Sequence, residues 1–210
     1  MDWSYQLSLT PLDCKIVCGL DEAGRGPLAG PVFAAAVILE DGCQIEGLND
    51  SKKLSEKKRQ ELFLQIKEKA VDWAIAHSEP YEIDKINILN ASMLAMRRAV
   101  EQLKVKPELL LVDGNVARNL PLPALPVVKG DGKLPSVAAA SILAKVARDQ
   151  FCQDMDGLFP QYEFAKNKGY PTKTHRELLK KYGPCPAHRQ SFLKKIIGEV
   201  HDGFQESFWN

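Results

Sequence analysis

Acidic residues stand at or shortly after the ends of three short apolar segments of this 210-residue chain: first Asp21-Glu22, then Asp113, then Asp131. Carboxylates are costly to desolvate, so acids at the buried ends of core strands need a partner. One such aspartate is more often a turn residue, but with three of them a bound divalent cation becomes an equal alternative. Oxygen ligands without cysteine or histidine at metal-binding spacing favour Mg²⁺ or Mn²⁺ over zinc.

The pair Asp21-Glu22 sets a condition on such a site. Adjacent residues of a strand point to opposite faces of a sheet, so the two side chains share a site only where the strand breaks up. Gly24 follows almost at once, which is consistent with a break. We therefore expect regular strand structure to end near this pair.

Two glycine-rich segments match nucleotide-binding motifs only in part. Gly24-Arg25-Gly26-Pro27-Leu28-Ala29 fits the dinucleotide fingerprint, but Gly30-Pro31 follows, so no long helix begins there. Gly130-Asp131-Gly132-Lys133 lacks the serine or threonine of a P-loop, because Leu134 stands in that place. These mismatches count against a nucleotide-dependent oxidoreductase and an NTPase. A Gly-Arg-Gly turn suits a phosphate instead, since its backbone N–H groups allow close approach and its arginine binds anions.

Apolar patterning predicts the elements that position these residues. Strands are expected at residues 15–20, 31–39, 71–77, 109–112 and 126–128. Helices are expected at residues 55–70 (capped by Ser55), 87–103, 137–152, 174–182 and 188–197. The order of these elements predicts an α/β domain with a mixed sheet and a helical C-terminal subregion.

The composition is that of an ordinary globular protein. Hydrophobic residues make up 45%, charged residues 26%, and the net charge is +1, which excludes a disordered chain. We expect one domain over residues 1–210. The longest apolar run is too short to span a bilayer, no secretory signal is recognisable, and the five cysteines show no paired spacing. These features predict a cytoplasmic protein without membrane contact.

Positive charge concentrates toward the C-terminus. Residues 161–200 contain nine lysines and arginines against three acids. Such a block is either a phosphate-binding face or a solvated helical surface. We expect a basic, helical subregion at about 160–197, which is substrate-binding under the first interpretation, followed by a tail at 198–210.

Further polar side chains are candidates for phosphate contact. The loop before the Ser55 helix carries four of them, which either bind phosphate or stay solvated: Asn49, Ser51, Lys52 and Lys53. Ser141 and Lys145 fall one turn apart on a helix and can face a phosphate together. Asp149 is expected to be a structural partner on that helix.

Histidines and cysteines show no arrangement typical of a metal site. We expect His77 to lie in the core of a strand and His175, His188 and His201 to lie at the surface. Cys185, inside a Pro-Cys-Pro turn, is expected to be the most exposed cysteine.

A series of short motifs runs in order from Asp21 to about Phe192: Asp21-Glu22-Ala23-Gly24-Arg25-Gly26, Gly30-Pro31-Val32, Asn49-Asp50-Ser51-Lys52-Lys53, Asp113-Gly114, Lys129-Gly130-Asp131, Ala139-Ala140-Ser141-Ile142, Lys145-Val146-Ala147-Arg148-Asp149 and Gly169-Tyr170-Pro171-Thr172. Together they resemble type 2 ribonuclease H, the ribonuclease HII family. The resemblance implies a ribonuclease H-like fold, in which helices flank a five-stranded mixed sheet of three antiparallel strands followed by two parallel ones.

The resemblance also implies a reaction. The chain would be an endoribonuclease that hydrolyses the RNA strand of RNA–DNA hybrids. It would also cut on the 5′ side of single ribonucleotides in duplex DNA, leaving a 3′-hydroxyl and a 5′-phosphate. By motif match, one or two Mn²⁺ or Mg²⁺ ions would be bound by the catalytic carboxylates Asp21, Glu22, Asp113 and Asp131.

Recognition of the 2′-hydroxyl is implied for Gly24-Arg25-Gly26 and Tyr170. This group is what distinguishes RNA from DNA at a given site. Without the resemblance, Tyr170 is better interpreted as a half-buried core aromatic beside a proline turn.

A nucleic-acid or phosphate binder without catalytic activity is the main alternative. Acids that face phosphates would weaken binding by such a protein, so the acids favour the nuclease. We expect a monomer that takes RNA–DNA hybrids and ribonucleotide-containing duplex DNA as substrates.

The end of the chain, Gln205-Glu206-Ser207-Phe208-Trp209, resembles the short peptides with which bacterial DNA enzymes bind the sliding clamp. A free terminus reaches a partner's pocket with little strain, and an aromatic pair can anchor it there. The alternative is that Phe208 and Trp209 pack onto their own domain.

Overall fold

The computed structural model describes residues 3–197, apart from the side chains of Lys195 and Ile197. The tail at 198–210, with the clamp-like sequence and His201, lies outside the described residues. A five-stranded sheet forms the centre, in the order β3-β2-β1-β4-β5. Its strands are β1 (Val17–Ala23), β2 (Val32–Ile38), β3 (Asp72–Ser78), β4 (Leu109–Asp113) and β5 (Ala124–Val127).

Strand direction changes across the sheet at β1. The strands β3, β2 and β1 are antiparallel neighbours, whereas β4 and β5 run parallel to β1. The predicted mixed sheet and its flanking helices are therefore confirmed. The short connection from β1 to β2 makes them adjacent, as expected from the glycine-rich turn.

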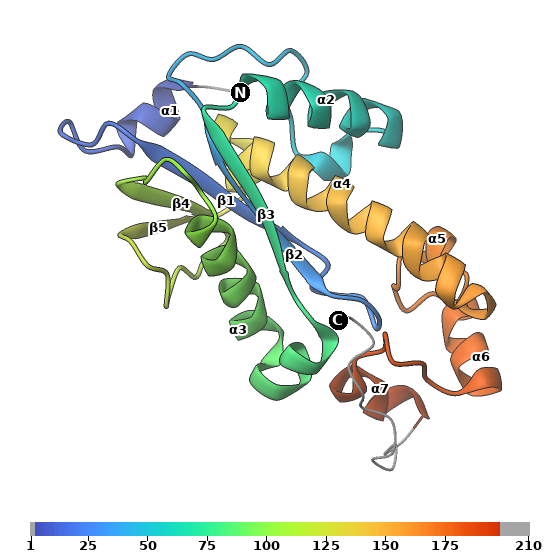
Figure 1. Cartoon of the computed structure of the whole chain (residues 1–210). Helices are drawn as coiled ribbons and strands as arrows, with labels where there is room; N and C mark the ends of the chain where they lie inside the picture. The colour runs from blue at the N-terminus through green and yellow to red at the C-terminus, as the bar shows by residue number, and fades with distance from the viewer. Residues whose placement is uncertain (1–2, 198–210) are drawn as a thin grey trace.

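Helices cover the two faces of the sheet (Figure 1), and each face has its own apolar cluster. The helix α3 (Pro80–Glu101) packs on one face, against Leu20, Ala34 and Leu110 among others. The helices α2 (Glu56–Lys69) and α4 (Pro135–Leu158) cover the other face. Ser55 caps α2, as predicted, by accepting a hydrogen bond from the Lys58 N–H.

Close packing brings α4 against β1 at Gly19. A Cβ atom at this residue would lie 2.2 Å from the backbone carbon of Ser136 and 2.4 Å from the backbone nitrogen of Val137. Only a residue without a side chain allows the helix backbone to lie directly on the strand.

Several elements depart from the sequence expectations, among them α4, which ends six residues later than expected, at Leu158. The helix α1 (Trp3–Ser8) was not expected. The helix α3 begins seven residues earlier than predicted, at Pro80, and kinks at Asn87, where φ is 65°. The strand β1 continues through Asp21 and Glu22 to Ala23, so the expected break is wrong. Pairing with β2 supports the strand through Ala23, although pairing with β4 ends at Leu20.

The C-terminal part gathers around the end of α4 (Figure 1). It consists of the 3₁₀ turn η3 (Pro160–Tyr162), α5 (Phe164–Asn167), α6 (Lys173–Tyr182) and α7 (Gln190–Ile197). An apolar cluster of its own, which includes Tyr162, Phe164 and Leu193, joins it to Cys152 and Met155 of α4.

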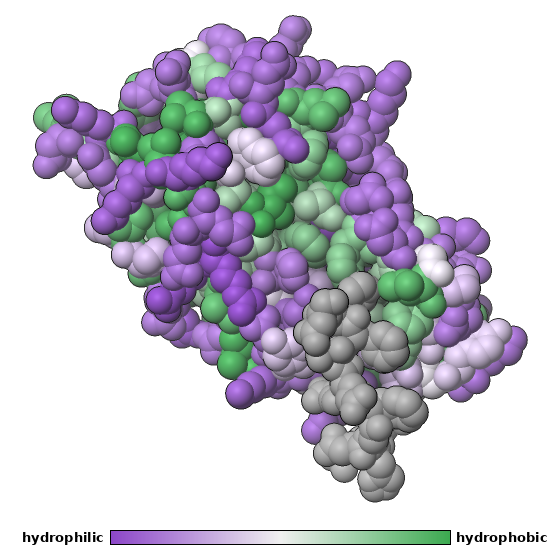
Figure 2. Space-filling model, viewed as in Figure 1, coloured by the Kyte–Doolittle hydropathy of each residue, from purple (hydrophilic) through white to green (hydrophobic). Residues whose placement is uncertain are grey.

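Hydrophilic side chains cover much of the face shown in Figure 2, and hydrophobic ones show across its middle, over the central strands. Among residues 3–197, none of the helices combines the length and the apolar character that crossing a membrane requires.

Candidate active site

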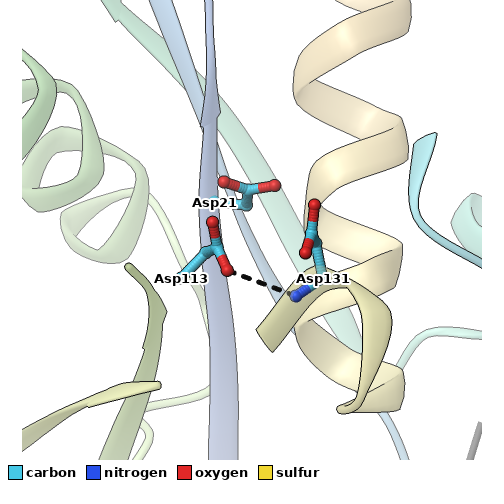
Figure 3. Close-up of side chains that lie close together, drawn as sticks. All are labelled: Asp21, Asp113 and Asp131. Atoms are coloured by element: carbon cyan, nitrogen blue, oxygen red, sulfur yellow. Dashed lines mark hydrogen bonds between the residues drawn. The ribbon is translucent and has the colours of Figure 1, made fainter. Parts of the chain in front are cut away.

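Three aspartates lie close together at the end of the parallel part of the sheet, which β1, β4 and β5 form. Asp21 and Asp113 follow the paired residues Leu20 and Val112 of the parallel strands β1 and β4. Asp131 lies in the 3₁₀ turn η2 (Gly130–Gly132), shortly after β5. One carboxylate oxygen of each lies within 4.8 Å of the others, and the side chains point toward one another (Figure 3). The sequence prediction that these acids converge is therefore correct.

Asp113 joins the strand end to η2. Its Oδ1 accepts the backbone N–H of Gly130 at 2.7 Å and that of Asp131 at 3.3 Å (Figure 3). Asp21 is fixed in a similar way, because its Oδ1 accepts the Glu22 N–H at 2.7 Å. Backbone N–H groups thus fix the orientation of both carboxylates.

Burial and mutual repulsion make this cluster electrostatically unfavourable. Asp21 and Asp131 are 4% and 6% exposed. Burial, together with the charges of Glu22 and Asp113, raises the pKa of Asp21 well above its usual value. Burial, followed by the charges of Asp113 and Asp50, also raises the pKa of Asp131. A divalent cation would relieve both effects, and hard oxygen ligands at this spacing fit Mg²⁺ or Mn²⁺. The donor set therefore fits a metal site.

Glu22 lies outside this group of three. The strand is regular here, so Asp21 faces the α4 side of the sheet, whereas Glu22 faces the other side. Its Oε1 pairs with Arg25 Nη1 at 3.3 Å. Burial raises the pKa of Glu22, and Arg25 opposes that shift.

The loop before α2 reaches the acidic cluster through Lys52. Its Nζ lies 3.5 Å from Asp131 Oδ2, and its side chain is otherwise exposed. Lys53 is also exposed, whereas Asn49 accepts the N–H of Asp50. Ser51 is buried, and its Oγ forms a 2.9 Å hydrogen bond with Ser141 Oγ.

Ser141 and Lys145, the two candidates for phosphate contact on α4, form contacts within the protein. Ser141 also forms a hydrogen bond with Asp21, which lowers the pKa of that carboxyl and partly opposes its burial. Lys145 Nζ pairs with Asp149 Oδ1 at 2.6 Å. Arg59 contributes a second cation near Asp149, 3.7 Å away, so the expected structural role of Asp149 is supported by its contacts.

The turn Gly24-Arg25-Gly26 is fixed by Arg189, which sequence reasoning did not single out. Arg189 is fully buried and donates to the carbonyls of Gly24 at 2.7 Å, Arg25 at 3.0 Å and Gly30 at 2.8 Å. Burial, together with the nearby Arg148, lowers the pKa of Arg189 to about 9. Arg189 lies just before α7 (Gln190–Ile197) and outside any regular element, so no periodic pattern in the sequence predicts its burial.

Arg148 supports the same turn from α4. Gly24 has φ of +101°, and a Cβ there would lie 2.0 Å from Arg148 Nε, so the guanidinium occupies the space that glycine leaves. Arg148 donates to the carbonyls of Lys168 and Ala29. A signal was available here, because Arg148 falls at helical spacing between the buried residues Ala144 and Cys152.

Tyr170 lies beside this turn. Its Cε1 is 3.6 Å from the position of a Cβ on Gly26, and the Arg148 guanidinium lies 5.8 Å from its ring centre. The ring is 41% exposed. The structure therefore brings Tyr170 and Gly24-Arg25-Gly26 onto one surface.

The family model for ribonuclease HII matches residues 18–195. The chain belongs to the ribonuclease HII family. A Ribonuclease HII from Idiomarina loihiensis is 62% identical over 187 residues, which are 88% of this chain and 100% of that protein. As a member of this family the chain is a metal-dependent endoribonuclease that acts on RNA–DNA hybrids, and the buried aspartates agree with that activity.

Solved structures show the same ribonuclease HII architecture. The ribonuclease H2 of Pyrococcus horikoshii superimposes with a TM-score of 0.70 at 28% identity, over 87% of this chain and 97% of that one. The ribonuclease HII of Archaeoglobus fulgidus, solved in a complex with PCNA, gives 0.66 at 27% identity, over 90% and 100%.

Several expectations about histidine and cysteine are wrong. His175 and His188 are 0% and 1% exposed, and Cys185 is also buried. The sequence suggested surface positions because this region is polar and basic, but the residues pack under Tyr162 and Phe164. His77 is exposed and pairs with Glu79, because it points away from the α3 face at the edge strand β3.

Proposed function

We propose that this enzyme cuts on the 5′ side of single ribonucleotides embedded in duplex DNA, as well as within RNA–DNA hybrids, leaving a 3′-hydroxyl and a 5′-phosphate. The observation that carries the proposal is the convergence of the Asp21, Asp113 and Asp131 carboxylates within 4.8 Å, beside a turn and a tyrosine suited to recognition of a sugar. Glu22 completes the proposed set of metal-binding acids from the adjacent position on β1.

The cofactor is proposed to be one or two Mn²⁺ or Mg²⁺ ions. Bound by these carboxylates, such ions would supply activation of a water and stabilisation of the charge on the leaving 3′-oxygen. The protein's part is to hold its carboxylates in place. Asp113 is oriented by two backbone N–H groups, and Asp21 by one backbone N–H and Ser141. Lys52 limits the excess negative charge at Asp131.

Recognition of the ribonucleotide is assigned to Gly24-Arg25-Gly26 and Tyr170. Two glycines let backbone groups approach a 2′-hydroxyl that a bulkier residue would block. The half-exposed ring of Tyr170 can stack on a sugar or base while its hydroxyl donates a hydrogen bond. Their common surface beside β1 supports a shared role.

Phosphate contacts are assigned to the basic parts around this surface. The loop candidates are Asn49, Ser51, Lys52 and Lys53; of these, Lys52 pairs with Asp131 and Ser51 contacts Ser141. Ser141 and Lys145 border the same region from α4. The basic subregion at about 160–197 adds exposed lysines such as Lys173 and Lys180, which favour binding of a polyanion.

A cleavage assay tests this proposal. A DNA duplex with one ribonucleotide is incubated with the enzyme, with Mn²⁺, with Mg²⁺ and with a chelator, beside an all-DNA duplex. We expect one cut on the 5′ side of the ribonucleotide, only with metal, and a product end that a polymerase extends. Cleavage of the all-DNA duplex, or none of the ribonucleotide duplex, contradicts the proposal.

We further propose that Gln205-Glu206-Ser207-Phe208-Trp209 binds a sliding clamp. The ribonuclease HII of A. fulgidus has been solved with PCNA, which supports a tether of this kind. A peptide of the last ten residues and its Phe208→Ala/Trp209→Ala version are titrated against the cognate clamp. Binding by the first alone supports the proposal, and equal or absent binding contradicts it.

The proposed working form is a cytoplasmic monomer. All five cysteines are free, which suits a reducing compartment.

A further inference from the structure

A buried chain of hydrogen bonds links Cys185 to the backbone of Tyr170 through two histidines. The Cys185 N–H donates to His188 Nδ1 at 3.0 Å. His188 Nε2 and His175 Nε2 are 3.0 Å apart. His175 Nδ1 lies 2.9 Å from the carbonyl oxygen of Tyr170. Neither histidine takes part in the proposed metal site.

The two ends of this chain determine where its protons lie. A backbone N–H only donates, so His188 Nδ1 must accept and carries no proton. A carbonyl only accepts, so His175 Nδ1 must carry a proton. If both rings are neutral, His188 carries its proton on Nε2 and His175 carries its proton on Nδ1. His188 Nε2 then donates to the unprotonated Nε2 of His175. A proton added to either ring would place two N–H groups against each other.

We propose that His188 and His175 form a relay of fixed tautomers that positions Tyr170 for recognition of the ribonucleotide. Both are positioning residues, and the inference rests on the role proposed for Tyr170. They belong to the C-terminal part, so this segment supports recognition through an internal contact as well as through surface charge.

The surroundings keep both rings neutral. His175 and His188 are almost fully buried, among the rings of Tyr162 and Phe164. Burial lowers the pKa of His188 to about 3, and it also lowers the pKa of His175. The Cys185 thiol, 3.1 Å from His188 Nδ1, stays protonated because burial raises its pKa to about 12.

The relay acts on a short, well-defined piece of backbone. The Tyr170 carbonyl also accepts the N–H of Thr172, so two donors fix its direction. The preceding Gly169 carbonyl accepts the N–H of Leu28, which ties the same segment to the chain after the Gly24-Arg25-Gly26 turn. Loss of the His175 donor would free one side of this peptide and let the ring shift from Gly26.

The tautomers are tested on the unchanged chain. Long-range ¹H–¹⁵N correlation spectra of the uniformly ¹⁵N-labelled protein at pH 7.5 report which nitrogen of each histidine carries the proton. We expect a proton on Nε2 of His188 and on Nδ1 of His175, with both rings neutral. The opposite tautomer or an imidazolium at either position overturns the relay. Because the test uses the unchanged protein, it does not require a substituted variant to fold.

The functional link is tested by a double-mutant cycle on a duplex with one ribonucleotide. His175→Phe keeps an aromatic ring against Phe164 but removes both nitrogens, and we expect about a tenfold loss of kcat/KM from misplacement of Tyr170. In a Tyr170→Ala background the same change is expected to have no further effect. His175→Asn, whose amide can replace the lost donor, should recover part of the loss.

Phe164→Leu is the matched control, because it disturbs the same cluster without breaking the relay. Its effect on kcat/KM, whatever its size, is expected to be equal in both backgrounds. An equal loss from His175→Phe in both backgrounds overturns the inference, since the histidine would then not act through Tyr170. Full activity of Tyr170→Ala alone contradicts the recognition role proposed for that tyrosine. Failure of the proposed function is thereby distinguished from failure of the histidine relay.

Discussion

At the scale of residues, Asp113 connects the parts of the active site. Its Oδ1 receives two N–H groups from η2, so the position of Asp131 depends on it. Asp21, by contrast, is held by its own strand and by Ser141. Removing a charge from either should therefore alter metal binding, while only Asp113 also controls a neighbouring turn.

Asp21→Asn and Asp113→Asn are expected to lower cleavage of an RNA–DNA hybrid by at least about a hundredfold at saturating Mg²⁺, because each removes a metal-binding carboxylate. Binding of the uncleaved duplex should stay the same or improve, because repulsion of phosphate decreases. Asp154→Asn, at an exposed position of α4, is the control. Near-normal cleavage by a variant would exclude its aspartate as a metal ligand.

Tyr170→Phe is expected to impair, and Tyr170→Ala to nearly abolish, cleavage at a single embedded ribonucleotide. The first change removes only the hydroxyl, whereas the second also removes the ring that lies beside Gly26. Rates on duplexes with one ribonucleotide measure both effects. Tyr182, also exposed, provides a control through Tyr182→Ala. If Tyr170→Ala and Tyr182→Ala cleave equally well, the proposed role is wrong.

The sequence predicted some of these residues better than others. The pattern identified Asp21, Asp113 and Asp131, because an acid at or shortly after the end of an apolar segment can be recognised from the sequence alone. The burial of His175 was not found, although Leu179 follows at helical spacing and is also buried. Its partner His188 lies in a loop without periodicity, so only the fold brings the two rings together.

At the scale of elements, two buried arginines from distant segments contact one glycine-rich turn. Arg148 reaches it from α4, and Arg189 reaches it from the residue before α7. Both guanidinium groups donate to backbone carbonyls. The turn's shape is therefore set by distant segments as much as by its own glycines.

Arg189→Lys is expected to reduce the free energy of unfolding by about 2–4 kcal/mol, because one ammonium cannot replace a planar group that donates to three carbonyls. Urea unfolding followed by circular dichroism measures the change. Lys194→Ala, at an exposed position of α7, should alter stability by no more than about 0.5 kcal/mol. Equal effects of the two substitutions would show that the three hydrogen bonds contribute little.

Elements were predicted well where apolar spacing was regular. All five strands and the helices α2, α4 and α6 lie where the pattern placed them, with end shifts that reach six residues at the end of α4. The start of α3 was missed because Asn87 interrupts the helical geometry, and the pattern was followed only from there. The helix α1 has only six residues, which are too few to show a helical period.

At the scale of the whole molecule, the buried histidines make stability depend on pH. In the folded state the pKa of His188 is about 3, and in the unfolded chain it returns to about 6.5. The unfolded state therefore binds more protons between these values. The stabilisation is complete above about pH 6.5 and is lost as the pH falls toward 3.

We expect the free energy of unfolding to fall by about 2 kcal/mol between pH 7.5 and pH 5 on account of His188. Urea unfolding at both values measures it. His188→Asn should show a smaller difference between the two pH values, because its side chain does not titrate while the carboxylates remain. An unchanged difference would show that His188 titrates normally in the folded protein.

The contact between Gly19 and α4 limits which sequences this architecture permits. Any side chain at position 19 would overlap the backbone at Ser136 and Val137. A deep mutational scan should therefore find this position as intolerant as Asp21, although Gly19 is buried beneath α4 and is assigned no contact with metal or substrate. Intolerance to substitution alone would therefore overestimate the number of catalytic residues. Assays that measure protein abundance separately from turnover are needed to distinguish packing positions such as Gly19 from catalytic positions such as Asp21.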